Sequence, residues 1–393
     1  MSDMISYLDE YGSIPFSQRG FGDADAVVLT QLCYCKFDSL VMGDDPVYMR
    51  DIIQNPDLDE LFIDPKYDRQ NRMLVARIFM GRRFRNMRLM RYVNIVDKET
   101  ETQFSAVTFL LPGGISFVAF RGTDESMVGW KEDFNLSYMK EIPGQKYACM
   151  YLNEVSGVIK GKFYVGGHSK GGHLAIYSCM HSDPSLQKRF IKIYCMDGPG
   201  FMKEMVSKEG YDRIRDRIVK IIPQSSLIGL AQERFPESCR VIKSNTWGFN
   251  QHNMYTWQFE NGDLEPDELR EGAKFFADTL NNWMLQLDTA KRKKASEITY
   301  RIMTGSEADN RIDFMANFTA NATSVLNTIR DLDPEAADLI QSLLKSLLND
   351  MRQNLKNELG TEGFTPVKEW IEEHIPSWVE KLKKPVSTGK EQI

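Results

Sequence analysis

A serine with a glycine two residues before it and another two residues after it is the feature of this chain that most suggests chemistry. Residues Gly167-His-Ser-Lys-Gly171 match the pattern G-x-S-x-G. This pattern places a serine on a sharp turn between a strand and a helix, with its hydroxyl held clear of the backbone. A helix that starts there directs N–H groups and its positive dipole end towards a developing oxyanion. The pattern predicts Ser169 as a nucleophile.

The residues around the serine supply the context that this pattern needs. Residues 163–165 (Phe-Tyr-Val) are strand formers, and a helical run begins near His173. The alternative is a phosphate-binding glycine-rich loop or a plain turn. The order G-x-x-x-x-G-K-[ST] of a phosphate loop is absent from this stretch, which favours the nucleophile turn.

A serine hydroxyl is a poor nucleophile at neutral pH and needs a base, usually a histidine held by an acid. His168 and His173 lie on either side of Ser169. In the geometry of this turn, we expect His168 to point away from the serine hydroxyl. His173, one helical turn further on, is expected to be a packing or capping residue. His252 follows the last expected strand, in the serine-then-histidine order of many hydrolases. We expect His252 to be the base, and the alternative is that it caps the next helix. The other histidines are at positions 181 and 374.

The acid that orients the base is harder to identify. Asp197 ends the strand after the nucleophile unit, at the carboxyl edge of the expected sheet. The more usual position follows the next strand, where residues 223–229 (PQSSLIG) contain no carboxylate. Glu233 and Glu237 come slightly later and are fallback candidates. We choose Asp197, although an aspartate before a glycine can also simply form a turn.

Two backbone N–H groups are needed to hold an oxyanion. We expect one from Lys170, directly after the nucleophile, and one from Thr123 in the Arg121-Gly-Thr loop. The Thr123 hydroxyl could add a further bond, and Asp124 and Asp133 are candidates for holding that loop. The alternative is that this loop is only a turn at the end of a strand.

The elements that must position these residues alternate between strands and helices. Such an alternation predicts an α/β fold with a mainly parallel central sheet covered on both faces, and a serine at the carboxyl end of a central strand. The segment 201–217 reads as an amphipathic helix that could cover the site. Strands are expected at 91–96, 104–111, 115–120, 163–165, 190–196, 218–222 and 240–243, and further helices at 23–37 and 144–159.

Two regions before the first of these strands carry further predictions. Residues 1–23 read as an irregular lead-in. A run dense in arginine follows later, and it could form an anion-binding face or line the wet side of a strand; we favour the strand. The arginines are at positions 69, 72, 77, 82, 83, 85, 88 and 91.

From residue 265 the strand signals stop and helical periodicity takes over. We expect an α/β-hydrolase domain at 1–262, a helical C-terminal region at 263–380 and a disordered tail at 381–393. The helical region could pack on the sheet domain, form a wall of the site or make a homodimer, and its basic run 291–294 reads as a solvated helix end. Its expected helices are 268–287, 312–332, 334–359 and 365–378.

Composition narrows the classes of function. The chain has 393 residues, 42% of them hydrophobic and 26% charged, with a net charge of −6, which is typical of a soluble globular protein and gives no reason to expect nucleic acid as a partner. No run approaches the roughly 18 apolar residues of a membrane helix. The N-terminus does not resemble a signal peptide, so the six dispersed cysteines should be reduced and the protein cytoplasmic. We expect no metal or organic cofactor.

These motifs together resemble known families. FVAFRGTD, residues 129–133 (GWKED) and GGHSKGGHLA are similar to the class 3 (fungal-type) lipases of the α/β-hydrolase fold. The resemblance is closer to the Mbeg1-like family, a bacterial family of unknown function, which also matches residues 197–201 (DGPGF) and the Gln251-His252 region. It covers roughly residues 25–260. It implies an α/β-hydrolase fold with Ser169 as nucleophile, Thr123 at the oxyanion position and His252 as base.

The chain departs from the lipase pattern in two places. Lys170 stands where lipases commonly have leucine, and its charge could favour an anionic substrate or simply face solvent. The usual acid is missing after the strand 218–222, which makes Asp197 the main candidate for the acid.

The leading hypothesis is a lipase- or esterase-like serine hydrolase that acts on a small-molecule ester or acyl substrate. One alternative is a hydrolase-fold protein that has lost catalysis and serves binding or assembly. Another is an acyltransferase or thioesterase that uses the same residues.

Overall fold

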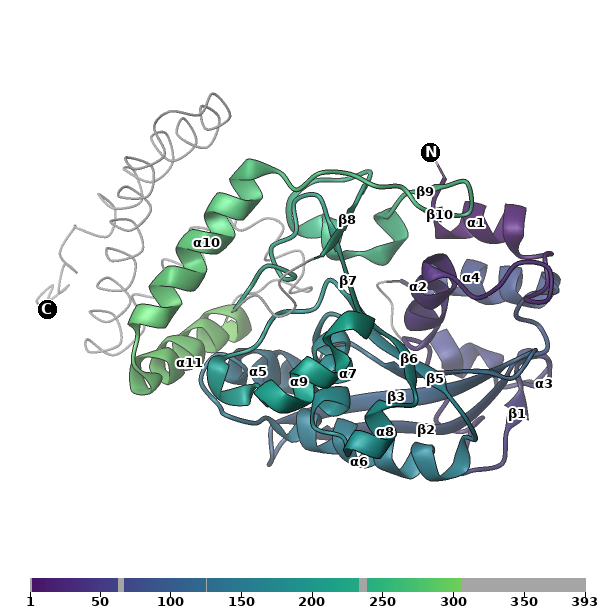
Figure 1. Cartoon of the computed structure of the whole chain (residues 1–393), viewed down its shortest axis with the longest axis horizontal. Coiled ribbons are helices and arrows are strands. Elements are labelled where there is room, and N and C mark those ends of the chain that lie inside the picture. Colours follow the sequence, from purple (N-terminus) through teal and green to yellow (C-terminus); the bar gives the residue numbers. More distant parts are fainter. Residues whose placement is uncertain (1, 63–66, 125, 233–238, 306–393) are drawn as a thin grey trace, which may run out of the picture. The chain divides into compact units, whose positions relative to one another are not determined.

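The computed structural model of the protein describes residues 2–62, 67–124, 126–232 and 239–305 (Figure 1). The chain forms two compact units, Met1–Leu269 and Arg270–Ile393. The helices expected at 312–332, 334–359 and 365–378 and the tail at 381–393 lie outside the described residues, and the domain boundaries and the dimer expected from the sequence stay predictions.

An eight-stranded sheet in which every strand lies beside its neighbours in the sequence forms the centre of the first unit. The pairings from β1 to β4 are antiparallel, and those from β4 to β8 are parallel. The predicted α/β class with a mainly parallel sheet is confirmed, with an antiparallel edge added. The strands are β1 Val47–Tyr48, β2 Arg88–Asp97, β3 Thr102–Leu111, β4 Ile115–Phe120, β5 Phe163–His168, β6 Phe190–Met196, β7 Ile218–Pro223 and β8 Arg240–Ile242.

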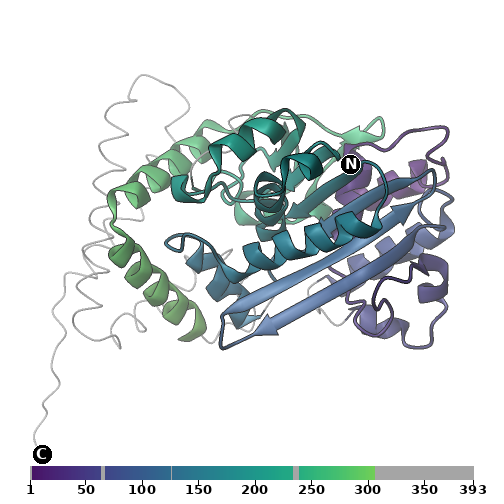
Figure 2. The same ribbon diagram turned by 60° about the horizontal axis from the view of Figure 1, so that its bottom comes forward.

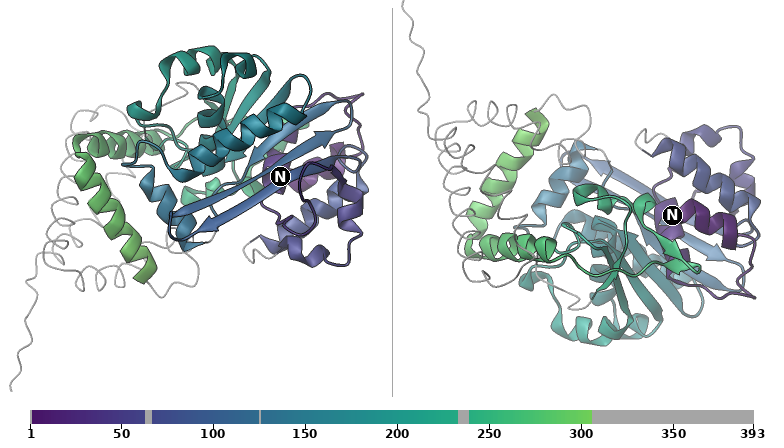
Figure 3. Two further views of the ribbon diagram at one scale, coloured as in Figure 1. Left: turned by 90° about the horizontal axis from the view of Figure 1, so that it is seen from below. Right: turned by 90° about the horizontal axis from the view of Figure 1, so that it is seen from above.

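Helices cover both faces of this sheet (Figures 2 and 3). Alternate residues of β4 show the division, because Phe117 and Ala119 join a core with α1, α2 and α4, whereas Val118 and Phe120 join a core with α6, α7 and α9. A strand buried on both faces reads as a continuous apolar run, as residues 117–120 of β4 do. The helices are α1 Met4–Tyr11, α2 Asp23–Leu32, α3 Met49–Ile53, α4 Asp68–Met80, α5 Met127–Asn135, α6 Pro143–Val158, α7 Lys170–Met180, α8 Pro184–Gln187 and α9 Lys208–Ile214.

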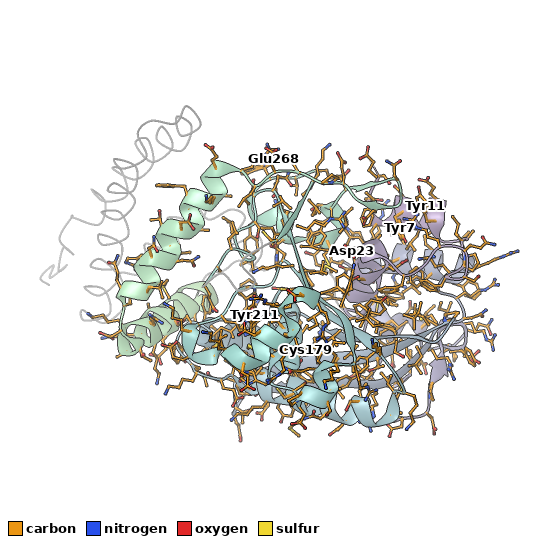
Figure 4. The ribbon with its side chains drawn as sticks, viewed as in Figure 1. Tyr7, Tyr11, Asp23, Cys179, Tyr211 and Glu268 are labelled. Carbon is orange, nitrogen blue, oxygen red and sulfur yellow. The ribbon has the colours of Figure 1, made fainter. Side chains whose placement is uncertain are left out.

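The N-terminal segment is helical where an irregular lead-in was expected. The Asp3 side chain caps α1 by accepting the N–H of Ser6 at 2.9 Å. Tyr7 stacks on Tyr11, with ring centroids 5.5 Å apart (Figure 4). The chain just before the helix is joined to β9 (Phe259–Glu260), because the N–H of Phe259 donates to Ser2 O at 2.7 Å. The prediction for residues 1–23 was therefore wrong over α1. This helix has eight residues with four buried side chains, and so short a segment gives little helical periodicity to detect.

The arginine-rich run does not line one strand. Arg69, Arg72 and Arg77 lie on α4, and Arg83 is fully buried, so the favoured interpretation was wrong for these four. Arg72 pairs with Asp68 one helical turn away at 3.0 Å, which is an ordinary exposed pairing along a helix.

The segment 201–217 is broken rather than one amphipathic helix. It contains a 3₁₀ turn at Lys203–Met205, then α9, then a second 3₁₀ turn at Arg215–Arg217. Tyr211 belongs to the same core as Cys179 of α7 (Figure 4). The idea that this segment is a mobile cover is not supported, because its apolar side chains are packed into the core.

The second unit is described over α10 (Glu271–Gln286) and α11 (Thr289–Gly305). α10 lies within the range 268–287 where a helix was expected and begins three residues later. The basic run 291–294 lies in the first turns of α11. None of the helices in the described part of the chain is both long and apolar enough to span a bilayer.

A buried ion pair ties the N-terminal segment to the turn before β2. The Arg83 guanidinium donates twice to the Asp25 carboxylate, from Nε and from Nη2, each at 2.6 Å. Tyr7 donates its hydroxyl to the same carboxylate at 2.8 Å. Each charge is therefore matched in the core. The remaining guanidinium donors bind the main-chain oxygens of Ile14, Arg19 and Gly20.

We expect Asp25→Asn to lower the free energy of unfolding by about 3 kcal/mol, because it leaves a buried guanidinium without its counter-charge. Denaturant titration of the full chain measures this. Asp59→Asn is the matched control, since Asp59 pairs with Arg72 on the surface and its change should stay within about 0.5 kcal/mol. Equal effects of the two variants would contradict the prediction.

A second buried polar group, His173, joins α6 to α7. Gln145 Oε1 accepts the N–H of Ile142, so its amide nitrogen faces His173 and donates to Nε2 at 2.8 Å. His173 Nδ1 then carries the proton and donates to Gly200 O at 2.8 Å. Burial lowers the pKa of His173 to about 4, which keeps the imidazole neutral.

Because the folded pKa lies below the unfolded value of about 6.5, the unfolded chain takes up a proton first as the pH falls. We expect His173 to cost about 2 kcal/mol of stability between pH 7.5 and pH 5. The free energy of unfolding of the wild type and of His173→Gln, measured across this range, should converge towards low pH. His168, whose pKa is also lowered, and Asp133, whose raised pKa acts in the opposite direction, are present in both proteins and cancel. Parallel curves would refute this assignment.

Candidate active site

Ser169 occupies a strained turn between a strand and a helix. β5 ends at His168 and α7 begins at Lys170, so the structure has the strand–turn–helix context that the motif requires. The Ser169 backbone has φ 57° and ψ −128°, a conformation that side-chain-bearing residues rarely adopt. Its N–H donates to Met196 O at 2.9 Å. The surrounding structure therefore keeps Ser169 in a strained backbone conformation, of the kind often found at functional sites.

Glycines make this turn possible by allowing main chains to touch. A Cβ added at Gly171 would lie 2.1 Å from Phe120 O, and one added at Gly167 would lie 2.6 Å from the same oxygen. At Gly122, in the loop after β4, an added Cβ would lie 3.1 Å from Ser169 Cβ. The loop that contains Thr123 therefore passes directly beside the serine.

The serine side chain is available to a ligand. Ser169 is half-buried between two buried neighbours, His168 and Lys170. Within the described residues, its hydrogen bonds are made by its main chain, and no direct bond joins its hydroxyl to His252. Such a contact commonly tightens only when substrate is bound.

His252 and Asp197 come together from different parts of the chain. His252 ends a 3₁₀ turn (Gly248–His252) after β8, and Asp197 directly follows β6. His252 Nδ1 donates to Asp197 Oδ2 at 2.6 Å. Asp197 is 1% exposed, so water competes little for this bond. His252 Nε2 is the ring nitrogen that remains to exchange a proton with a substrate.

His168 attaches the His252 segment to the serine turn. Burial lowers the pKa of His168 well below its usual range, so its imidazole is neutral. Its Nε2 donates to His252 O at 2.8 Å, and Nδ1 accepts from the Tyr34 hydroxyl at 2.7 Å. The two imidazole rings lie 4.4 Å apart. The residue before Ser169 thus positions the main chain of the candidate base.

Ser226 holds the other side of the candidate acid. Its hydroxyl donates to Asp197 Oδ1 and accepts the N–H of Gly229 at 2.9 Å. Ser226 lies after β7, at the usual position of the acid in the lipase pattern. This chain therefore has a hydroxyl near that position, and the hydroxyl binds the carboxylate of Asp197. The fallback candidates Glu233 and Glu237 lie outside the described residues.

The Thr123 loop is held by both aspartates that the sequence suggested. Thr123 Oγ1 donates to Asp133 Oδ2 at 2.6 Å, so the hydroxyl proton is committed there and the main-chain N–H is the donor left for an oxyanion. Asp124 accepts from Arg121 Nη2 at 3.0 Å. Burial raises the pKa of Asp133 to about 6, while Lys170 and the Thr123 hydroxyl oppose that rise.

Lys170 follows neither alternative that the sequence suggested. Its side chain is 1% exposed, so it does not face solvent. Its Nζ pairs with Glu132 Oε2 at 2.6 Å and is directed into the core rather than towards a ligand. An anionic substrate therefore gains no direct contact from this charge.

Sequence reasoning missed four residues of this arrangement: Tyr34, Ser226, Glu132 and Gln103. Each acts through a contact distant in sequence, and no local pattern marks them. Within the described residues, no group of three or more histidine, cysteine, aspartate or glutamate side chains is arranged to hold a metal ion.

Comparison with known proteins gives one match to a family and a similarity to a solved structure. No curated protein matches the chain. The crystal structure of M37 lipase is similar with a TM-score of 0.34 and 15% sequence identity, over 59% of this chain and 71% of that one. The model of the Mbeg1-like family matches residues 78–301, which is more than half of the sequence. The chain therefore belongs to the Mbeg1-like family.

Proposed function

We propose that this protein is a serine hydrolase that cleaves a carboxylic ester with Ser169 as nucleophile, His252 as base and Asp197 as the orienting acid. The observation that carries the proposal is the 2.6 Å hydrogen bond between His252 and Asp197, formed beside a serine with a strained backbone. A histidine used only as a helix cap would need neither a buried carboxylate on Nδ1 nor a nucleophile turn beside it.

In the first half of the reaction, Ser169 Oγ attacks the ester carbonyl carbon while His252 Nε2 takes the hydroxyl proton. The main-chain N–H groups of Thr123 and Lys170 bind the oxyanion of the tetrahedral intermediate. Collapse of the intermediate breaks the bond to the alcohol oxygen, which receives the proton from His252. An acyl group then remains on Ser169.

Water completes the reaction by the same steps. His252 takes a proton from water as the water oxygen attacks the acyl carbon, and it returns that proton to Ser169 Oγ as the acid leaves. Asp197 takes no proton in these steps; it keeps the proton on Nδ1 and stabilises the imidazolium that forms.

A fluorophosphonate probe tests for an activated serine. We expect the purified, folded wild type to be labelled, and Ser169→Ala and His252→Ala to be unlabelled, because the probe reacts with a serine only when a base assists it. Ser182→Ala, at a serine just beyond α7, is the matched control and should label like the wild type. Labelling that survives Ser169→Ala would place the reactive serine elsewhere, and an unlabelled wild type would favour a binding or assembly protein without catalysis.

Asp197→Asn tests the acid. An amide at this position favours the wrong tautomer of His252, so we expect kcat for p-nitrophenyl butyrate to fall about 10⁴-fold, by analogy with serine proteases, with a small change in KM. Steady-state kinetics on the full chain measure both constants. A fall of less than about tenfold would show that Asp197 is not the acid of this site.

A further inference from the structure

The Lys170 side chain is completely engaged by the protein. An ammonium group has three N–H donors. In Lys170 they bind Gln103 O at 2.8 Å, Gln103 Oε1 at 2.9 Å and Glu132 Oε2 at 2.6 Å. The residue that follows the nucleophile is therefore anchored to β3 and α5 through its side chain.

Glu132 is engaged just as completely at the other end of the pair. It is 0% exposed, and its Oε2 also accepts the N–H of Gln103 at 3.1 Å. Its Oε1 accepts the N–H of Gly144 at 2.7 Å, in the first turn of α6. One carboxylate thus joins β3, α6 and α7 at a single point.

The neighbouring residue on α5, Asp133, holds the other half of the proposed oxyanion site. It accepts the Thr123 hydroxyl, so consecutive residues of one helix bind the two residues whose N–H groups would hold the oxyanion. α5 is also in close contact at Gly129, where an added Cβ would lie 2.8 Å from Thr123 Cγ2 and 3.2 Å from Gln103 Oε1. The separation of the two donors is therefore set through α5.

Stability alone does not account for a buried lysine at this position. Removing two charges from water costs several kcal/mol, and an apolar pair of similar volume is often as stable or more stable. What the ion pair adds is directional bonding, because the three donors of Lys170 and both carboxylate oxygens of Glu132 have defined partners.

We propose that the Lys170–Glu132 ion pair fixes the distance between the two oxyanion donors, so that the Lys170 side chain and Glu132 are positioning residues for the reaction. This inference rests on the proposed function. An oxyanion exists only along the reaction path, so a misplaced donor weakens the transition state and leaves substrate binding unchanged.

The experiment compares Glu132→Gln, Lys170→Met and the double variant in the full chain. Each single variant leaves one buried charge unpaired and could lose stability, whereas the double variant removes both charges and keeps similar volumes. For p-nitrophenyl butyrate we expect kcat to fall roughly ten- to a hundredfold in all three, with KM unchanged, per mole of folded protein. The acid limb of the pH profile should stay at its wild-type position, because the His252–Asp197 pair is untouched.

Asp25→Asn is the matched control, since it also neutralises a buried carboxylate paired with a cation, but in the Arg83 cluster. It should lower the melting temperature and keep the wild-type kcat. A double variant that folds and retains the wild-type kcat would overturn the inference, and so would an equal loss of kcat in Asp25→Asn. A wild type that neither labels nor hydrolyses the ester would instead remove the proposed function, and the inference with it.

Discussion

The close contact of main chains at the ends of β4 and β5 is the constraint on which the rest of this structure depends. Gly167 and Gly171 allow the serine turn to touch Phe120 O, and Gly122 allows the next loop to pass beside Ser169. Side chains at these positions would separate the strand ends and with them Ser169 and the Thr123 loop. The position of Ser169 beside the Thr123 loop follows from this contact.

Most of the sheet and the residues of the candidate site were predictable, because they carry local signals. Short segments rich in apolar and β-branched residues marked β3, β4 and β6, and the glycine spacing marked the turn at Ser169. Asp197 was chosen from its place at the end of β6, and the structure gives it His252 as a hydrogen-bond partner. These inferences needed only period, spacing and the rule that parallel strands share a carboxyl edge.

The features that sequence reasoning missed depend on contacts between distant segments. The direction of Lys170 is decided by Glu132, 38 positions earlier, and no local pattern distinguishes a buried lysine from an exposed one. Arg83 is likewise buried because Asp25 lies opposite it. The run of arginines led to a wrong prediction because charged side chains are usually exposed to solvent. Arg83 is buried only because its partner, distant in sequence, lies opposite it.

The hydrogen bond from Phe259 to Ser2 O has a consequence for how the chain folds during synthesis. The strands follow one another in the sheet in the order in which they leave the ribosome, so each can pair with one already made. α1 can pack early through the bond from Tyr7 to Asp25, but its contact with Phe259 forms only once the chain has been made as far as β9. The loop between α1 and β9 therefore closes late in synthesis, after the strands β1 to β8 have been made.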